Sequence, residues 1–372
     1  MKRIGNLYEQ IISVENLRLA DEKARRGKTS AYGVRCHDKN REANIQALHE
    51  ALRTKTYRTS PYDVFTIYEP KERIIYRLPY YPDRIVHHAI MNILEPIWVR
   101  TFTHNTFSCV KERGIEGCSR YVDKIIRKYD GKPLYCLKID LRKFYPSVSH
   151  EVLKSIVRRK IKDPDLLWLL DDVIDSAVTP PEQKPLPERS FFNVGGRCVP
   201  VYVGDVDDLT GLPIGNYLSQ YLANLILCYV MHRVNEVYRV DAAEYADDIA
   251  LFSDSKERLR EVFALLCQDL FGLRLTVKAN WQIFPIADNR FDRHGRALDY
   301  VGYKFYRKQK LIRKKTKQNF CRQCARLNRE QPLRDVKAYK QAVAPWLGWA
   351  KHSNSRNLLR TQIHPKYYES VL

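Results

Sequence analysis

The chain of 372 residues carries 64 lysines and arginines against 43 aspartates and glutamates. The net charge of +21 favours a polyanionic partner such as nucleic acid over a generically basic role. A hydrophobic content of 44% is enough for one large or two to three smaller packed units. No apolar run reaches the roughly 18 residues of a membrane span, and the charged start at residues 1–5 is unlike a signal peptide. With nine cysteines at scattered spacings, we expect reduced thiols and a cytoplasmic location.

The first 130 residues predict helices and one β-hairpin. Apolar residues at helical spacing predict helices over 7–27 and about 38–52, followed by 82–99 and 117–129. Between them, the runs 64–68 and 73–76 predict two strands joined around residues 69–72. Lys71 and Arg73 lie at the tip and second strand of this hairpin, where cations suit either a solvated face or the binding of phosphate groups.

The next segments predict strands that end in carboxylates, interrupted by helices. A buried strand over 134–139 ends at Asp140, and helices are expected over 150–160 and 163–177. Residues 180–212, interrupted by Pro and Gly, predict a loop or hairpin excursion and not a domain boundary. A long helix over 217–237 precedes a strand–turn–strand unit with Asp247 and Asp248 at its bend.

The last third predicts a helix over 255–271, a strand over 273–278 and a turn-rich stretch before the segment 298–305. Residues 307–372 are rich in cations and helix formers, which indicates a basic helical appendage. Cys321 and Cys324 lie in this appendage as a lone pair, so we do not expect a zinc or redox site there.

The Asp247–Asp248 pair is the candidate reactive site. Two adjacent carboxylates repel each other, and each prefers to be protonated unless a cation is present. Alone, the pair fits a solvated turn as well as it fits a metal site. Asp140, at the end of another apolar strand, supplies a third carboxylate. Such oxygen donors suit Mg²⁺, and two ions roughly 3.5–4 Å apart can activate a 3′-hydroxyl and stabilise a leaving pyrophosphate.

These motifs, in this order, resemble those of bacterial-type reverse transcriptases over about residues 57–306. Residues 137–145 (Leu-Lys-Ile-Asp-Leu-Arg-Lys-Phe-Tyr) resemble motif A of that family, residues 212–220 (Leu-Pro-Ile-Gly-Asn-Tyr-Leu-Ser-Gln) motif B, and residues 245–248 (Tyr-Ala-Asp-Asp) motif C. Residues 273–278 resemble motif D, residues 300–303 the primer grip, and residues 69–73 and 83–88 the fingers motif of intron-type enzymes. The resemblance implies an RNA-directed DNA polymerase with an α+β, right-hand fold.

The resemblance also implies a role for each matching residue. Asp140 and Asp247 would hold two Mg²⁺ ions, with Mn²⁺ as an alternative, and Asp248 would support them. Lys278 would protonate the pyrophosphate, and Tyr145 would exclude a ribose 2′-hydroxyl. The other implied contacts are those of Lys71, Arg73, Ile214, Gly215 and Gln220 with the incoming dNTP, and those of Tyr300, Val301 and Gly302 with the primer. For the lysines, Arg73 and Tyr145, a solvated face or an ordinary core position is the alternative.

Motif B departs from the usual pattern of the family. Most reverse transcriptases carry a glutamine immediately before the glycine and a Ser-Pro later, whereas here Ile214 precedes Gly215 and Gln220 follows Ser219. This variant resembles the enzymes of diversity-generating retroelements, in which error-prone copying of a template RNA, especially at adenines, diversifies a target gene. Replacing an amide by isoleucine removes a hydrogen-bonding restraint beside the nascent base pair, which predicts lower fidelity.

The implied organisation is discontinuous in sequence. An N-terminal basic helical extension would span 1–55, the fingers 56–130 and 150–213, the palm 131–149 and 214–306, and a basic helical thumb 307–372. The implied partners are template RNA, the RNA/DNA duplex, dNTPs and a basic oligomeric accessory protein. Retron, intron-derived and antiphage reverse transcriptases share the catalytic core and stay open as alternatives. A non-catalytic RNA-binding protein with the same fold is disfavoured, because buried like charges without metal are costly.

Overall fold

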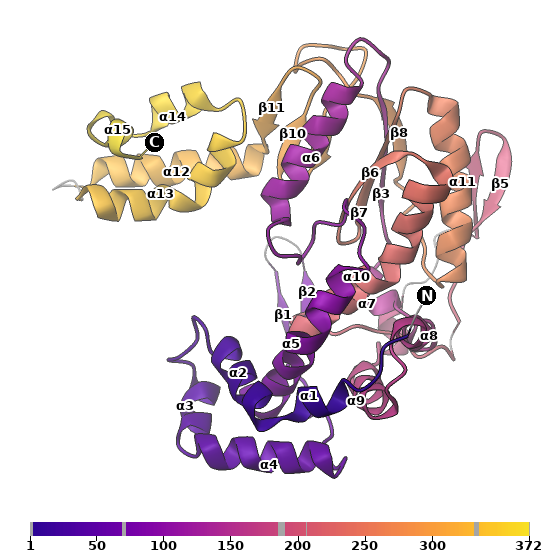
Figure 1. Ribbon diagram of the computed structural model, residues 1–372. Coiled ribbons are helices and arrows are strands. Elements are labelled where there is room, and N and C mark those ends of the chain that lie inside the picture. Colours follow the sequence, from indigo (N-terminus) through magenta and orange to yellow (C-terminus); the bar gives the residue numbers. More distant parts are fainter. Residues whose placement is uncertain (1–2, 69–71, 185–189, 206, 331–334, 372) are drawn as a thin grey trace.

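A four-stranded antiparallel sheet forms the centre of this α+β protein (Figure 1). The computed structural model describes residues 3–68, 72–184, 190–205, 207–330 and 335–371. The strand order is β6 (Asp241–Tyr245), β7 (Asp248–Ser253), β3 (Tyr135–Asp140) and β8 (Gln282–Pro285). Strands β3 and β7 pair in a register that sets Asp140 opposite Asp248. The predicted buried strand and the predicted strand–turn–strand unit are therefore confirmed, and they are neighbours.

The two faces of this sheet are covered by different elements, as the period-2 alternation of side chains requires. Leu137, Ile139 and Leu251 belong to a large core with α10 (Tyr217–His232) and α11 (Lys256–Gly272). Cys136 and Phe252 point to the other face. There they pack with α6 (Gly114–Lys128) and with a three-stranded sheet of β9 (Leu298–Tyr300), β10 (Tyr303–Phe305) and β11 (Lys310–Ile312).

Four N-terminal helices lie at one end of the molecule in Figure 1. They are α1 (Tyr8–Ile12), α2 (Val14–Ala24), α3 (Tyr32–Asp38) and α4 (Arg41–Arg53). The single helix expected over 7–27 is broken at Ser13, whose backbone leaves the helical region and whose side chain accepts a hydrogen bond from Asn16 N–H to cap α2. Helix α3 was not expected from the sequence.

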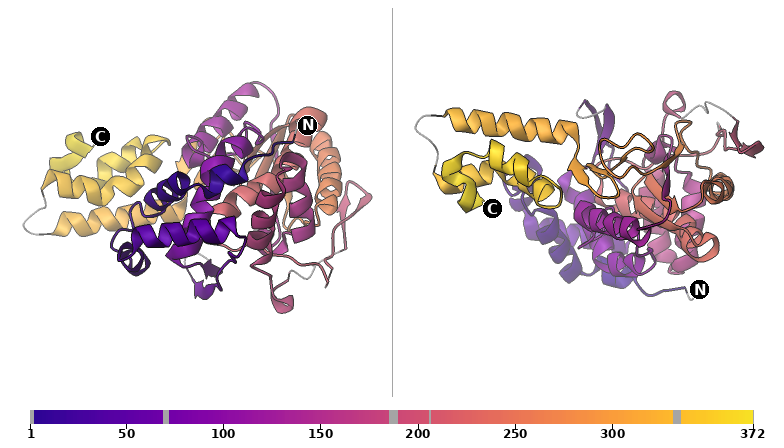
Figure 2. Two further views of the ribbon diagram at one scale, coloured as in Figure 1. Left: turned by 60° about the horizontal axis from the view of Figure 1, so that its bottom comes forward. Right: turned by 90° about the horizontal axis from the view of Figure 1, so that it is seen from above.

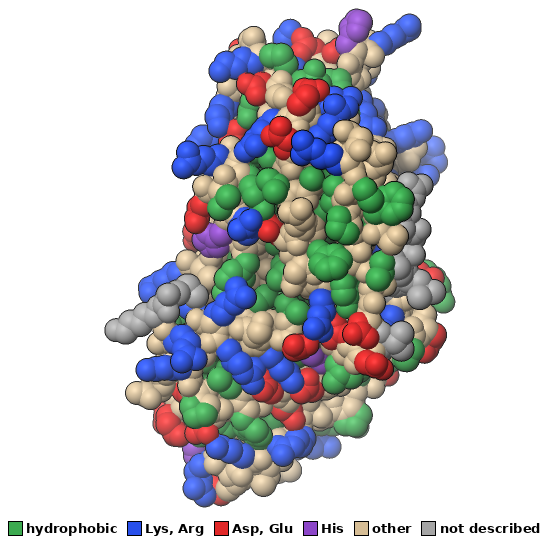
Figure 3. Space-filling view, turned by 90° about the vertical axis from the view of Figure 1, so that its right-hand side faces the viewer, with side chains coloured by type: hydrophobic (Ala, Val, Ile, Leu, Met, Phe, Trp, Pro, Cys, Tyr) green, Lys and Arg blue, Asp and Glu red, His purple; other side chains and the backbone are tan. Residues whose placement is uncertain are grey.

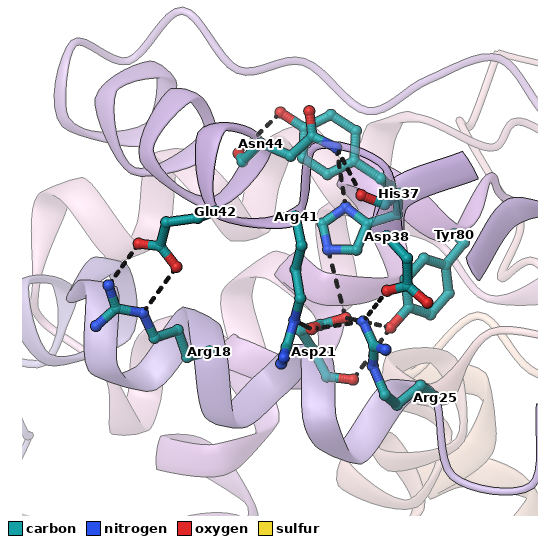
Figure 4. Close-up of polar contacts among 10 residues, drawn as sticks. Arg18, Asp21, Arg25, His37, Asp38, Arg41, Glu42, Asn44 and Tyr80 are labelled. Carbon is teal, nitrogen blue, oxygen red and sulfur yellow. Dashed lines mark hydrogen bonds and ion pairs between the residues drawn. The ribbon is translucent and has the colours of Figure 1, made fainter. Parts of the chain in front are cut away.

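The fully buried carboxylate of Asp21 holds these N-terminal helices together (Figure 4). Arg25 and Arg41 donate hydrogen bonds of 2.9 and 2.6 Å to it, and Tyr80 donates a further one from the turn before α5 (Ile85–Val99). Burial alone would raise the pKa of Asp21, but the hydrogen bonds from Tyr80, Arg25 and Arg41 outweigh burial and lower that pKa. The buried charge of Asp21 is tolerated because two arginines and a tyrosine hydroxyl donate hydrogen bonds to it.

The first residues of the chain are anchored to a distant helix start. Asp163 caps α9 (Pro164–Asp175) by accepting from Leu166 N–H, and its other oxygen accepts from Leu7 N–H (2.7 Å) and Tyr8 N–H (3.0 Å). Ile4 forms an isolated parallel bridge with Ile161, just before that cap. The N-terminal helices are therefore tied to the 150–175 region as well as to α5.

Two hairpins flank the sheet. Strands β1 (Asp63–Ile67) and β2 (Arg73–Arg77) form the first, as predicted, and lie between the sheet and the N-terminal helices (Figure 1). Strands β4 (Phe191–Val194) and β5 (Arg197–Pro200) form the second within the predicted excursion, and they pack near α11. Figure 3 shows this side of the molecule, with hydrophobic side chains across its middle and cations above and below. The structure also has the helices α7 (Phe144–Ser147) and α8 (His150–Lys160). Short π-helical turns span Tyr80–Arg84 and Arg233–Tyr238, and short 3-10 turns span Pro181–Gln183 and Pro365–Tyr367.

The C-terminal helical unit has a core of its own. It consists of α12 (Lys314–Arg329), α13 (Val336–Lys351), α14 (Arg356–Gln362) and α15 (Tyr368–Val371), and it projects from the rest of the chain (Figure 2). Cys324 is buried in that core. In the described part of the chain, no three His, Cys, Asp or Glu side chains lie close enough together to hold a metal ion. No described helix is both long and apolar enough to cross a membrane.

The strand expected over 273–278 is wrong. Arg274 adopts a left-handed φ of 56°, and the segment makes only an isolated bridge between Val277 and Leu141 before the chain turns again. The edge strand β8 instead follows at Gln282–Pro285. The appendage after residue 307 is also not purely helical, because β11 joins the sheet of β9 and β10.

Candidate active site

Three carboxylates lie near one another where β3 ends and β7 begins. Asp140 is the last residue of β3 and lies opposite Asp248, the first residue of β7. Asp247 occupies the turn between β6 and β7, and its carbonyl accepts a hydrogen bond of 3.2 Å from Leu141 N–H. Ala246, the other residue of this turn, has a left-handed φ of 55°. Residues about a hundred positions apart in the sequence are therefore brought together at one end of the two central strands.

The carboxylates repel one another. Burial, and then the charge of Asp140, raise the pKa of Asp247 to about 6. Burial raises the pKa of Asp248 too, against the lowering effect of the Lys138 ammonium. A site of this kind gains stability from any cation that neutralises it.

Two lysines neutralise part of this charge. Lys278 Nζ lies 2.7 Å from Asp140 Oδ2, and Lys278 N–H bonds to the Asp140 carbonyl at 2.9 Å. Lys138 Nζ lies 3.7 Å from Asp248 Oδ1 and donates to the carbonyl of Asp299 at 3.0 Å. The structure thus brings Lys278 against the first of the three carboxylates. Lys138 was not singled out, although its position two residues before Asp140 puts both side chains on the same face of the strand.

The donor set fits hard divalent ions. Asp140 Oδ1 is buried and has no hydrogen-bond partner among the described residues, so one oxygen is left to bind a ligand. Carboxylate oxygens are the donors that Mg²⁺ and Mn²⁺ prefer. As they stand, however, the described His, Cys, Asp and Glu side chains do not converge as three ligands, and Lys278 occupies Asp140 Oδ2. A metal ion would compete with this lysine for the carboxylate.

Tyr145 and Arg73 border the carboxylates. Tyr145 lies in α7, immediately after the strand end, and packs against the large core. Burial is the main cause that raises its pKa; the charges of Cys109 and Asp247 raise it further, and that of Arg73 lowers it. Lys71 lies outside the described residues.

The glycine loop before α10 is fastened to the β1–β2 hairpin. Tyr76 N–H donates to the Ile214 carbonyl at 3.0 Å, and Asn216 Nδ2 donates to the Tyr76 carbonyl at 3.3 Å. Gly215 has a left-handed φ of 113°, and a Cβ there would lie 3.1 Å from Ile75 Cγ2. The backbone conformation therefore favours glycine, and a Cβ would in addition make a tight contact with Ile75. Gln220 is partly buried in the first turn of α10.

The predicted primer-grip segment forms the β9–β10 turn. Val301 and Gly302 have positive φ values of 39° and 86°. The side chain of Tyr300 is fully buried, so it cannot reach a nucleic acid strand. Between β8 and this segment, a cavity of about 300 Å³ opens beside Asp140. Its lining includes Lys138, Asn280, Gln282, Phe284, Arg296 and Asp299.

Glu244 was missed by sequence reasoning. It is fully buried three residues before Asp247. Its Oε2 accepts from the Thr106 hydroxyl at 2.8 Å, and its Oε1 has no partner within the described part of the chain. Burial raises the pKa of Glu244 to about 8. The alternation of β6 could have indicated that this side chain points to the core, because Tyr245 and Ala243 point the other way.

Comparison with known proteins agrees with this geometry. Residues 69–305 match the family described as reverse transcriptase (RNA-dependent DNA polymerase). Protein YkfC of Escherichia coli K12 is 28% identical over 245 residues, which are 65% of this chain and 54% of that protein. The chain therefore spans about half the length of this curated relative. Because the family match covers well over half of the chain and includes every carboxylate of the site, the protein belongs to the reverse transcriptase family.

Proposed function

We propose that this protein is an RNA-directed DNA polymerase that extends a primer by two-metal nucleotidyl transfer. The observation that carries the proposal is the register of β3 and β7, which sets Asp140 opposite Asp248 beside Asp247. Bound Mg²⁺ ions would activate the primer 3′-hydroxyl and stabilise the leaving pyrophosphate. Asp140 and Asp247 would hold these ions, with Asp248 in support.

The surrounding residues divide the remaining tasks. Lys278, which donates a hydrogen bond to Asp140, would give a proton to the pyrophosphate. Arg73 would bind the triphosphate, and Tyr145, partly buried against the large core, would exclude the 2′-hydroxyl of a ribonucleotide. Lys71 is proposed as a second triphosphate contact from its sequence alone.

The elements correspond to a right hand in this proposal. The central sheet with α6, α10 and α11 would be the palm, β1–β2 with α5, α8 and α9 the fingers, and the C-terminal helical unit the thumb. Template RNA and the RNA/DNA duplex would lie against these parts, drawn by the charge of +21.

The test is dNTP incorporation on a primed RNA template with and without Mg²⁺. We expect Mg²⁺-dependent extension, and a loss of at least roughly a thousandfold in kcat for Asp247→Asn, because a neutral amide is a poor ligand for the ion. The matched control is Asp254→Asn, a carboxylate that follows the far end of β7. RNA binding without any extension by the unmodified protein would favour the non-catalytic alternative.

Within the family, we propose the class found in diversity-generating retroelements. Its support is Ile214 before Gly215, held at its backbone by Tyr76 from the β1–β2 hairpin. An apolar side chain at this joint offers no hydrogen bond to a base pair. A basic oligomeric accessory protein would then be the partner, and the retron, intron-derived and antiphage classes are the alternatives.

Fidelity measures the contribution of Ile214. We expect Ile214→Gln to lower the misincorporation frequency at template adenines by roughly tenfold, because a restored amide adds about one hydrogen bond of discrimination. Sequencing of cDNA from a defined RNA template gives the frequencies at all four bases. Ile214→Leu is the matched control, since it keeps an apolar side chain. Equal adenine error rates in all three proteins would contradict the proposal.

A further inference from the structure

The hydroxyl of Tyr300 reaches the catalytic turn from outside the central sheet. Tyr300 is the last residue of β9, and its Oη lies 2.8 Å from the Asp248 carbonyl and 2.9 Å from the Ala243 carbonyl. A hydroxyl has one hydrogen, so the two carbonyls share it in a three-centre bond. Ala243 lies before the turn and Asp248 after it, so this one hydroxyl joins the two strands next to the turn.

The turn has a backbone conformation that needs such support. Ala246 adopts a left-handed φ of 55°, which is unfavourable for any residue with a Cβ. Such conformations persist only when the surrounding structure holds them in place. The turn is also held by Leu141, whose N–H donates a hydrogen bond of 3.2 Å to the Asp247 carbonyl.

Tyr300 is itself held from the opposite side. Its ring is fully buried in the second core with α6, and the following Gly302 lies against the C-terminal helical unit. A Cβ on Gly302 would come within 2.2 Å of the Trp349 ring, and Arg313 N–H donates to the Gly302 carbonyl at 3.1 Å. The hydroxyl therefore extends from a fixed support and is not free to rotate toward solvent.

We propose that Tyr300 is a positioning residue, whose hydroxyl fixes the Asp247–Asp248 turn in the arrangement that metal binding and catalysis require. This inference rests on the proposed polymerase function and deepens it by naming what holds the carboxylates. It also separates Tyr300 from the primer contact expected at this position, because a fully buried ring acts on the enzyme and not on the nucleic acid.

Tyr300→Phe tests the hydroxyl while keeping the ring. The matched control is Tyr129→Phe, because Tyr129 also donates from its hydroxyl to the β6–β7 hairpin, to Asp241 Oδ2 at 2.9 Å, but at the open end of the hairpin. For Tyr300→Phe we expect a kcat lower by roughly three- to tenfold, which is the effect of losing one hydrogen bond. The KM for dNTP should be nearly unchanged. Tyr129→Phe should keep the wild-type kcat.

Two readouts without catalysis separate this inference from the proposed function. In metal-free protein, amide hydrogen exchange in residues 245–248 should be faster in Tyr300→Phe than in wild type or Tyr129→Phe. The dissociation constant for Mn²⁺, measured by electron paramagnetic resonance, should rise by roughly threefold or more in Tyr300→Phe alone. Wild-type exchange at the turn together with wild-type Mn²⁺ affinity in Tyr300→Phe would overturn the inference. A wild-type protein that binds Mn²⁺ with this dependence but incorporates no dNTP would overturn the proposed function instead.

Discussion

Glu244 is an ionisable group that the fold keeps away from water. It is fully buried; one carboxylate oxygen accepts from Thr106, and the other has no partner among the residues that the structure describes. Burial raises its pKa to about 8, from the usual 4.5, so the folded protein holds it as a neutral acid at neutral pH. Its backbone also pairs with the 105–107 segment, because Glu244 N–H donates to the Asn105 carbonyl and Phe107 N–H donates to the Glu244 carbonyl.

The stability of the protein should therefore depend on pH through Glu244. The folded pKa lies above the unfolded one, so the folded chain keeps a proton that the unfolded chain releases between about pH 4.5 and 8. In that window we expect the free energy of unfolding to fall with rising pH by up to about 1.4 kcal/mol per unit. Glu244→Gln, which keeps an acceptor for Thr106 but does not titrate, should lose this slope.

Urea unfolding at several pH values between 5 and 9 measures the difference between the two proteins. Because wild type and Glu244→Gln share all other titrating groups, the effects of those groups cancel in the difference between their free energies of unfolding. Parallel pH profiles for wild type and Glu244→Gln would contradict a neutral, buried Glu244.

At the scale of elements, the β9–β10 turn is the joint between the sheets and the C-terminal helical unit. Trp349 of α13 lies so close to Gly302 that a Cβ would come within 2.2 Å of the ring, and its ring centroid is 5.1 Å from that of Tyr303. Contacts of this kind transmit displacement, because packed interiors have little free space.

Gly302→Ala should disturb the contact between the β9–β10 turn and Trp349. We expect a loss of about 2–4 kcal/mol in the free energy of unfolding, from overpacking against Trp349 added to the strain of a positive φ. Gly131→Ala is the matched control, because Gly131 also has a positive φ (73°) but has nothing within 4 Å of its Cβ position. The double variant Gly302→Ala/Trp349→Ala should be less destabilised than the sum of its parts. Equal losses for the two single glycine variants would show that the Trp349 contact contributes nothing.

Elements with a strong local pattern could be predicted from the sequence. The apolar run that ends at Asp140 and the strand–turn–strand unit around Asp247 are both present within a residue or two. The strand expected over 273–278 failed because a left-handed Arg274 bends a segment whose composition suits a strand. The break at Ser13 depends on a capping bond, which competes with a helical pattern that is equally good on both sides.

The candidate site shows the same division. The three carboxylates and Lys278 could be named from motifs, but the pairing of Asp140 with Asp248 depends on a strand register between distant segments. The hydroxyl bond of Tyr300 and the buried Glu244 depend on packing in three dimensions. The Tyr300 bond leaves no period or motif in the sequence, whereas for Glu244 the alternation of β6 could have indicated only that the side chain points to the core.

At the scale of the whole molecule, charge should govern nucleic acid binding. Helix α12 buries Phe320, Cys324 and Leu327 on one face and exposes a set of cations on the other, which form no ion pair with the described residues. These are Lys314, Lys315, Lys317, Arg322 and Arg326. Such a face suits a phosphate backbone.

The salt dependence of RNA/DNA duplex binding measures this contribution. We expect Lys314→Ala/Lys317→Ala/Arg322→Ala to weaken binding at low salt and to reduce the slope of log K against log salt concentration by about 2–3. As control, Arg18→Ala/Arg53→Ala/Arg258→Ala removes three cations that already pair with Glu42, Glu50 and Glu261. A slope that changes equally in both triple variants would indicate a non-specific effect of net charge.

The anchoring of the first residues at Asp163 has a consequence for how the chain folds as it is synthesised. The bond from Leu7 N–H to Asp163 joins residues 156 positions apart. Leu7 and Tyr8 leave the ribosome early, but Asp163 is added only 156 and 155 residues after them. Contacts of such separation are slow to form and leave apolar surface exposed in the meantime. Until α9 has been made, the nascent N-terminal helices can dock only on earlier elements such as α5, with the Asp21 cluster beside that contact.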